Sequence, residues 1–164
     1  MKMWTEAECR ELIDVIFKRY DIDDVAVDVR KRRKMGVYTC VRTTDPRPAV
    51  PIVTYDKKVI RLARWLFSGN YGKWKMETSP TKRLIVVLHE CAHAVLHKVN
   101  LDAFVTQPSH GQAFRNLERL LIGEHGWRPI YPDGAVKGYP THYVNTDDAS
   151  EINIRNCNPT LRRS

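Results

Sequence analysis

Two histidines and a glutamate in the middle of the chain have the types and the spacing of a metal site. His89, Glu90 and His93 form the pattern H-E-x-x-H inside a segment of helical periodicity. At about 3.6 residues per turn, positions i and i+4 share one face of a helix, so both imidazoles can reach one ion. Glu90 projects beside them, where it can activate a metal-bound water without ligating the metal. The pattern therefore predicts one catalytic Zn²⁺ as cofactor, with Glu90 as the catalytic base.

A catalytic zinc needs a third protein ligand, and His110 is the best candidate for it. The 16 residues between His93 and His110 allow the chain to leave the metal helix, turn back and start another helix at the metal. His97 is excluded, because eight residues of helix place it about 12 Å along the axis from the first ligand. Glu118 is the acidic alternative. The remaining histidines are weaker options for the same role: His125 and His142.

The elements that must position these residues alternate between helical and strand periodicity. In chain order we expect a helix over 5–20, strands over 25–29, 37–43 and 52–55, and helices over 59–67, 81–99 and 109–123. The first helix begins at a capping box of Thr5 and Glu8, and Ser109 is expected to cap the last. The first two strands are predicted to form a hairpin connected by residues 30–34. This order predicts an α+β fold, with a small antiparallel sheet packed against the metal helix.

The length of 164 residues suits one domain, with a core over about residues 5–123. Residues 124–164 are interrupted by prolines and glycines and are expected to be irregular, with one short strand at most. The longest uninterrupted aliphatic run has five residues, 84–88, so no membrane-spanning helix and no membrane partner are predicted. The N-terminus carries acids where a signal peptide needs an apolar stretch.

The four cysteines are Cys9, Cys40, Cys91 and Cys157. They are far apart and form no C-x-x-C pair, which excludes a cysteine zinc ribbon and gives no sign of a disulfide framework. We therefore expect a reducing compartment, the cytoplasm or the nucleus. Cys91 falls on the apolar stripe of the metal helix and is expected to be a packed small residue rather than a nucleophile.

Positive charge is concentrated in the middle of the chain. The net charge is −4 over residues 1–29, +12 over 30–98 and zero over 99–164. A surface with this positive charge attracts polyanions, nucleic acid above all. A solvated surface that only keeps the protein soluble explains the same charge distribution equally well. Trp74 lies between two of the bases and could stack on an unpaired base. The residues that would contact DNA are Arg30, Lys31, Arg32, Arg33, Lys34, Lys73, Trp74 and Lys75.

The segment His-Glu-Cys-Ala-His, followed after 16 residues by His-Gly-Gln-Ala-Phe, resembles the SprT-like zinc metallopeptidases. Their pattern is H-E-x-x-H and then a histidine in an H-G-x-x-F/W segment that opens the next helix. The resemblance implies a zincin-like fold, zinc held by His89, His93 and His110, and hydrolysis of peptide bonds. The family includes proteases that act on DNA-associated proteins, as in the Spartan branch. Many members carry a cysteine zinc ribbon that this chain lacks.

These observations together predict a zinc metallopeptidase whose partners are a protein or peptide substrate and DNA. Two alternatives remain open at the level of the sequence. One is a regulatory zinc peptidase in which Glu118 is the third ligand. The other is a nucleic-acid-binding module without catalysis, in which a fourth protein ligand closes a structural metal site.

Overall fold

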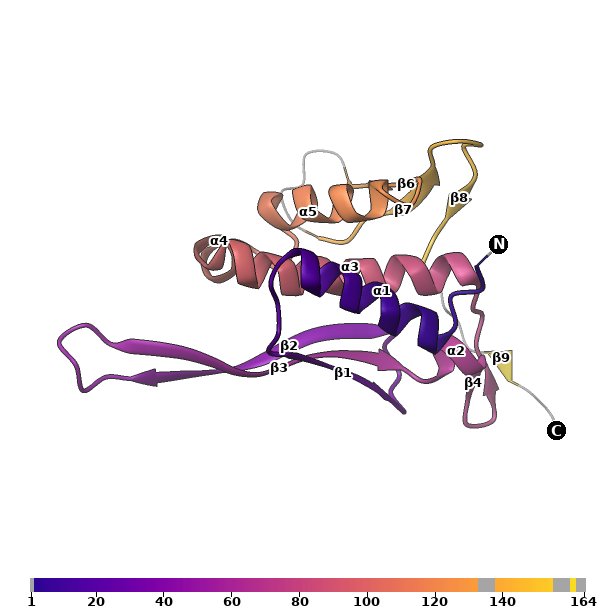
Figure 1. Ribbon diagram of the computed structural model, residues 1–164. Coiled ribbons are helices and arrows are strands. Elements are labelled where there is room, and N and C mark those ends of the chain that lie inside the picture. The colour runs from indigo at the N-terminus through magenta and orange to yellow at the C-terminus, as the bar shows by residue number, and fades with distance from the viewer. Residues whose placement is uncertain (1, 133–137, 155–159, 162–164) are drawn as a thin grey trace.

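The computed structural model describes residues 2–132, 138–154 and 160–161, and it has the mixed α+β composition that the sequence predicts. Figure 1 shows three layers. A three-stranded sheet forms the first layer, and α1 (Glu6–Arg19) and α3 (Pro80–Val99) lie on one face of it. On the other side of α3 lie α5 (Gln112–Gly123) and a second small sheet. The helix α3, which carries His89 and His93, is therefore the central element of the described structure.

The first sheet is mixed, in the order β1–β3–β2, so the prediction of an antiparallel sheet is wrong. Its strands are β1 (Val25–Arg30), β2 (Gly36–Asp45) and β3 (Ile52–Ala63). β3 runs parallel to β1 and antiparallel to β2. The predicted hairpin between the first two strands is also wrong, since β3 inserts between them and residues 31–35 bridge the gap.

β3 is longer than expected, and it replaces most of the helix predicted over residues 59–67. Ile60 and Leu62 are fully buried and alternate with the partly exposed Val59 and Arg61, which is the period of a strand packed on one face. The same apolar residues also fit a helical period, and the partner strand β1 lies more than thirty residues away. Only α2 (Trp65–Ser68) is helical, and Gly69 ends it in the left-handed conformation at φ 76°.

The two long helices begin where local capping chemistry predicts. The Thr5 hydroxyl accepts from the Glu8 backbone N–H, and the Glu8 carboxylate accepts from the Thr5 backbone N–H, so the capping box of α1 is confirmed. In α3, the Ser79 hydroxyl accepts from the backbone N–H of Lys82, and Pro80 occupies the first turn. The core lies between α1, α3 and the sheet, where the following side chains are at most 2% exposed: Ile13, Ile16, Ile60, Leu62, Ile85 and Leu88.

The segment after α3 differs from the prediction in two ways. A short helix that the sequence did not indicate, α4 (Leu101–Thr106), follows α3 directly and is capped by the Asn100 side chain. α5 then begins at Gln112 with Gly111, which has no side chain, as its N-cap, and the Gln107 side chain accepts from the backbone N–H of Ala113 at 3.1 Å. The predicted cap by Ser109 is wrong, because its hydroxyl contacts His110 Nδ1 at 3.3 Å instead.

In the described part of residues 124–164, the structure has strands where the prolines and glycines suggested an irregular segment. β6 (Trp127–Ile130), β7 (His142–Asn145) and β8 (Glu151–Ile152) form an antiparallel sheet that packs on α5 through β6. β4 (Asn70–Tyr71), β5 (Trp74–Lys75) and β9 (Thr160–Leu161) form a third, very small sheet. No helix among the described residues is long and apolar enough to cross a membrane.

Candidate metal centre

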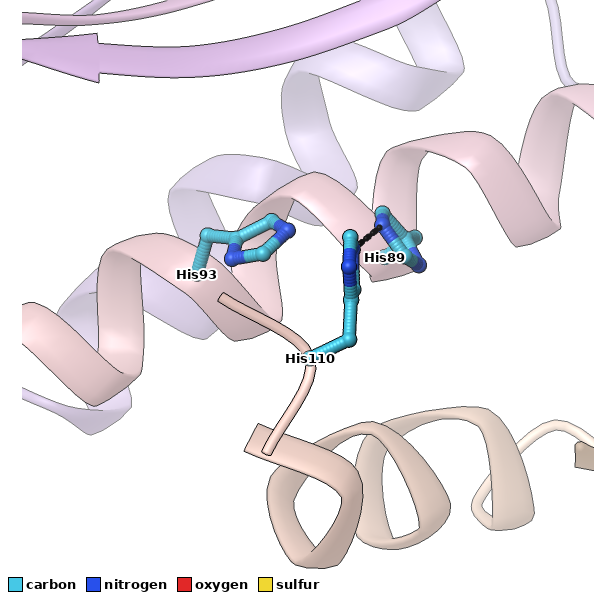
Figure 2. A group of neighbouring side chains, drawn as sticks. All are labelled: His89, His93 and His110. Atoms are coloured by element: carbon cyan, nitrogen blue, oxygen red, sulfur yellow. Dashed lines mark hydrogen bonds between the residues drawn. The ribbon is translucent and has the colours of Figure 1, made fainter. Parts of the chain in front are cut away.

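Three histidines converge between α3 and the start of α5. His89 and His93 project from the same face of α3, and His110 reaches them from the loop that precedes α5 (Figure 2). One ring nitrogen from each can be chosen so that all three atoms lie within 4.8 Å of one another. His89 and His110 are buried, and His93 is half-buried. The structure thus brings together the three residues that the sequence predicts as zinc ligands.

The spacing of these nitrogens fits one small ion. His89 Nε2 and His110 Nε2 are 3.2 Å apart. Two ligands of a tetrahedral zinc at about 2.0–2.1 Å would be about 3.3 Å apart. Three imidazoles and no thiolate suit Zn²⁺ among the common metals, as well as Cu²⁺, Ni²⁺ and Fe²⁺. The described residues therefore hold a cluster that could bind one metal ion, and its geometry leaves the identity of the metal open.

Phe114 fixes the three rings relative to one another. It is the third residue of α5 and is fully buried. Its ring stacks on His93 with centroids 4.1 Å apart, and it meets His89 and His110 edge-on at 5.0 Å each. Because Phe114 is anchored in α5, the packing of this helix on α3 sets the position of the imidazoles. The phenylalanine of the H-G-x-x-F segment thus has a structural role at the site.

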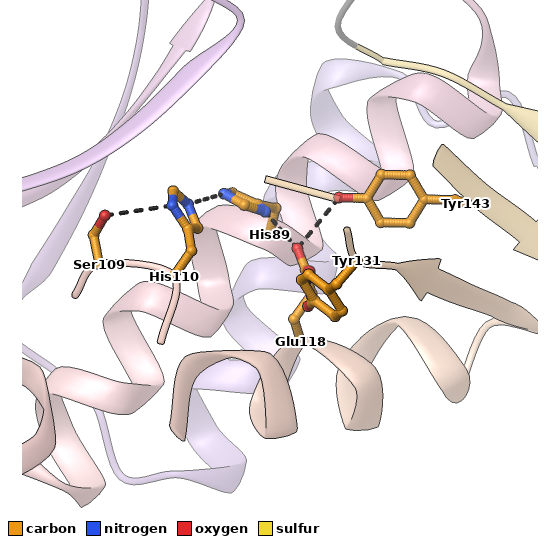
Figure 3. Close-up of polar contacts among 6 residues, drawn as sticks. All are labelled: His89, Ser109, His110, Glu118, Tyr131 and Tyr143. Atoms are coloured by element: carbon orange, nitrogen blue, oxygen red, sulfur yellow. Dashed lines mark hydrogen bonds and ion pairs between the residues drawn. The ribbon is translucent and has the colours of Figure 1, made fainter. Parts of the chain in front are cut away.

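Glu118 lies behind His89 rather than among the ligand nitrogens (Figure 3). Its Oε2 accepts a hydrogen bond from His89 Nδ1, and the carboxylate is fully buried. Tyr131 donates to Glu118 Oε1, and Tyr143 donates to Oε2 at 3.3 Å. A carboxylate on Nδ1 leaves Nε2 of the same ring with its lone pair toward the cluster. Glu118 therefore orients His89, and this contact speaks against its role as a third ligand.

The buried charges around His89 shift several pKa values. Burial lowers the pKa of His89, but the hydrogen bond and the charge of Glu118, together with the charge of Glu90, raise it above its ordinary value. Burial raises the pKa of Glu118, and the contacts with His89 and Tyr131 outweigh it and lower the pKa. The pKa of His93 lies well below its ordinary value, first because of burial and then because of its two histidine neighbours. His93 is consequently neutral near pH 7, the form that binds a metal.

Glu90 is buried next to the cluster, against the first residue of β2. A Cβ placed on Gly36 would lie 3.0 Å from Glu90 Cγ and 3.3 Å from its Oε1. Burial raises the pKa of Glu90, while His89 and Arg32 oppose the shift. A bound cation would stabilise the carboxylate further. The absence of a side chain at Gly36 is what allows the strand to approach Glu90 this closely.

Two cavities meet at Glu90. The larger, about 850 Å³, is the aromatic cavity, and its apolar wall is formed by Trp65, Tyr71, Trp74, Met76, Val86 and Tyr143. The smaller, about 500 Å³, is the polar cavity, lined among others by Tyr38, Thr39, Cys40, Gln107, Ser109 and His110. Gly36, His89, Glu90 and Tyr139 line both. The candidate site therefore lies where two chemically different cavities join.

The other histidines are placed away from the cluster. His97 lies further along α3, where its Nδ1 is 2.6 Å from the Tyr38 hydroxyl and its ring stacks on Phe104 at 4.1 Å. His125 packs edge-on against Trp4, and His142 Nδ1 contacts the Thr141 hydroxyl at 2.8 Å. Neither belongs to the metal cluster of the described residues. The exclusion of His97 as a ligand agrees with this geometry.

Among the described tail residues that can donate a hydrogen bond, Tyr139 lies against the histidine cluster. Its ring centroid is 4.2 Å from that of His110 and 5.8 Å from that of His89. Its side chain is about half exposed and lines both cavities. No periodicity marks the segment around Tyr139, so the sequence does not single this residue out. Tyr131 and its contact with Glu118 carried no signal in the sequence at all.

The two basic segments, residues 30–34 and 73–75, come together at the mouth of the aromatic cavity. Lys31 Nζ lies 5.6 Å from the centre of the Tyr71 ring, and Lys73 Nζ lies 5.9 Å from that of Trp74. Arg33 and Lys34 are exposed and line the cavity itself. Arg30 and Arg32 have partners within the protein: Arg30 pairs with Asp28, and Arg32 donates to the Arg61 carbonyl at 3.2 Å.

Three cysteines fall within the described residues and none is in a disulfide, while Cys157 lies outside them. Cys91 is fully buried on α3, as expected for a packing residue, and burial raises the pKa of its thiol. The structure thus defines an α+β protein with a buried cluster of three histidines that could hold a metal. In comparisons of the whole chain, no family model, no curated protein and no solved structure matched it. The resemblance to SprT-like peptidases therefore depends on the two motifs alone.

Proposed function

We propose that this protein is a zinc metallopeptidase of zincin-like architecture. The observation that carries the proposal is the three-histidine cluster with Glu90 beside it and Glu118 behind it. His89, His93 and His110 would hold the ion, and Glu118 would fix the ring of His89. When bound, Zn²⁺ lowers the pKa of water and polarises the scissile carbonyl.

Glu90 is the general base in this proposal. It accepts the proton of the attacking water and returns it to the departing amine. Burial already raises its pKa, which brings a carboxylate closer to the range in which it can both take and release a proton. Tyr139, which borders both cavities, is the donor that we assign to the developing oxyanion.

The test of the activity is hydrolysis of a casein-like protein and of labelled peptides, with a chelator and then with zinc restored. We expect activity to be lost with the chelator and regained with zinc. Glu90→Gln keeps the shape of the side chain and removes the base, so it should bind zinc normally and lose activity by several orders of magnitude. Undiminished cleavage by this variant would refute the mechanism.

Tyr139→Phe separates the hydroxyl from the ring. Loss of a donor to an oxyanion costs about 10²–10³ in kcat in comparable sites. We expect a loss in kcat with KM and zinc content close to those of the wild type. An unchanged kcat would remove Tyr139 from the reaction.

The arrangement of the described residues supports the two alternative functions less well. A peptidase with Glu118 as third ligand needs its carboxylate among the nitrogens, whereas it contacts Nδ1 on the far side of His89. A structural metal site needs a fourth protein ligand. The metal cluster of the described residues has three members. Metal stoichiometry and the exchange of water at the bound metal distinguish an open site from a closed one.

DNA is a second partner in the proposal, and the observation that favours it is the convergence of two basic segments at one mouth. Phosphate contacts should give an affinity that falls by about 0.7 to 0.9 log units per log unit of salt for each contact. We would change residues 30–34 together to Ser, with Arg42, Arg47 and Lys57 changed to Ser as a control on another surface. An affinity and slope unaffected by the first change would remove DNA from the proposed function.

A further inference from the structure

The aromatic cavity is the larger of the two cavities that Glu90 lines, and the proposed reaction assigns it no task. Trp65 and Tyr143 are at most 2% exposed, Met76 is 5% exposed, and Tyr71 and Trp74 are half-buried at its border. His89 and Glu90 form part of the same wall. A group bound in this cavity would therefore lie directly beside the reacting centre.

Size and chemistry indicate what can enter. About 850 Å³ is in the range of cavities that bind drug-sized molecules, which is more than enough room for one large side chain together with the next residue. An aromatic or long aliphatic side chain would lose contact with water and gain contact with the aromatic rings and the Met76 thioether of the wall. This exchange favours binding. A charged side chain in the same place would lose hydration without a partner on the apolar wall.

The mouth has the opposite chemistry. Arg33 and Lys34 line it, and Lys31 and Lys73 lie over the rings of Tyr71 and Trp74. Among the described residues that line the cavity, Glu90 is the one acid. A residue next to the buried side chain would thus meet cations, and an acidic residue is the complement of such a rim.

The polar cavity on the other side of Glu90 makes the site asymmetric. It is smaller, and its lining combines the hydroxyl, amide and imidazole groups of Tyr38, Thr39, Gln107, Ser109 and His110 with apolar residues such as Val37, Leu96 and Phe104, a larger polar share than in the aromatic cavity. A chain that passes Gly36 and Tyr139, the residues common to both cavities, would place its two neighbouring side chains in different surroundings. The site can therefore distinguish the two sides of a bond.

We propose that the aromatic cavity binds a bulky apolar side chain adjacent to the scissile bond, in a peptide whose next residue is acidic. The inference depends on the proposed peptidase function and specifies its substrate class. Burial of one large apolar side chain corresponds to a preference of about 10- to 100-fold over alanine. An unpaired nucleic-acid base, which could also stack on Tyr71 and Trp74, is the competing occupant. We favour the peptide because two reacting residues belong to the wall.

The experiment measures binding and cleavage separately. Zinc-loaded Glu90→Gln protein would be titrated with labelled peptides that differ at one position, Phe, Leu, Ala or Asp, followed by Glu or Lys. Wild-type protein would cleave the same series to give kcat/KM. We expect Phe and Leu to exceed Ala by about 10- to 100-fold, Asp to be poorest, and Glu to be favoured over Lys. Equal affinity across the series, or no binding of any peptide, would overturn the proposal.

Two variants test the residues themselves. Trp74→Ala should reduce the preference for Phe over Ala, with the effect mainly in KM. Arg33→Glu with Lys34→Glu should reverse the preference from the Glu to the Lys peptide, a gain that misfolding cannot produce. Arg42→Glu with Lys57→Glu makes the same change of charge on the exposed part of the β2–β3 hairpin and should alter nothing. If the peptide preferences persist in the Trp74→Ala variant and in the Arg33→Glu, Lys34→Glu variant, the cavity is not the site that binds the side chain.

The remaining outcomes separate this inference from the proposed function. Selective binding to Glu90→Gln without cleavage by the wild type would leave the cavity as a peptide site and refute the peptidase. Cleavage by the wild type without any preference among the peptides would support the peptidase and refute the assignment of the cavity. Displacement of the peptide by a short oligothymidylate, with no selectivity among peptides, would assign the cavity to a base.

Discussion

At the scale of single residues, the two nitrogens of His89 have different tasks. Nε2 faces His110, and Nδ1 donates to Glu118, which in turn accepts from two tyrosines. The spacing of H-E-x-x-H indicated the first of these tasks, because i and i+4 on a helix are neighbours. It could not indicate the second, since Glu118 and Tyr131 come from elements whose packing on α3 is not encoded in local periodicity. The residues that contact the candidate ligands from behind, Glu118 and Tyr131, could therefore not be predicted from the sequence.

The third ligand can be tested by comparing two histidines. His110→Ala should lower zinc affinity by several orders of magnitude, because it removes one of three nitrogens of the cluster. His97→Ala removes a buried histidine that contacts Tyr38 and Phe104 instead, so it should leave the affinity nearly unchanged. Metal analysis after dialysis against a competing chelator measures both. Retention of zinc by the first variant would exclude His110 as a ligand.

Glu118→Gln tests the residue behind His89. Zinc needs a neutral His89, whose pKa Glu118 and Glu90 raise above the ordinary value, so affinity should fall as the pH drops through that raised pKa. In the variant, the uncharged amide at position 118 no longer stabilises protonated His89. The loss of zinc affinity should therefore occur at lower pH than in the wild type. At higher pH the affinity should be about 10- to 100-fold weaker, as for other partners of ligating histidines.

The measurement is zinc affinity by chelator competition from about pH 5.5 to 8.5. Glu124→Gln is the matched control, because Glu124 follows the same helix but pairs with Arg19 at the surface. Identical pH profiles for wild type and Glu118→Gln would show that the carboxylate does not set the protonation of His89. Complete loss of zinc at every pH would instead favour Glu118 as a ligand.

At the scale of elements, the sequence was informative where a signal is local. Thr5 with Glu8 and the apolar stripe of α3 marked the two long helices correctly. The sequence was misleading at Val59–Ala63, where Ile60 and Leu62 fit both helical and strand periods and only the pairing with β1 and β2 decides. It failed again after Trp127, because β6, β7 and β8 are short and each is stabilised by partners across a turn or loop. Non-local pairing is the information that one sequence does not display.

The close approach of β2 to α3 gives a prediction at this scale. Gly36→Ala would force Glu90 and Val86 to move by a few tenths of an ångström. A small displacement of a catalytic group is costly, and we expect kcat to fall about tenfold with zinc content unchanged. Gly123→Ala is the control, because a Cβ there meets nothing within 4 Å. Equal activity of both variants would mean that the contact does not position Glu90.

At the scale of the whole molecule, the candidate metal site joins two layers. His89 and His93 belong to the helix that packs on the first sheet, while His110 belongs to the chain that leads into α5 and the second sheet (Figure 1). Without a metal, the described contacts between these layers include the packing of Phe114, Leu121 and Ile122, all fully buried. A metal would add bonds between elements that hydrophobic packing already holds together. It would therefore stabilise the relative position of the layers in addition to any catalytic role.

The effect of zinc on stability is the last prediction. A ligand that binds the folded state alone adds about 4 kcal/mol at a free concentration a thousand times its Kd. For a chain of this length that corresponds to a rise in Tm of roughly 8–16 °C. Hydrogen exchange should slow most over residues 107–123 and around His89, and least in α1. His110→Ala should abolish both effects, while Glu90→Gln, which keeps the three imidazoles, should retain them. A Tm that does not depend on zinc in the wild type would contradict a metal shared between the layers.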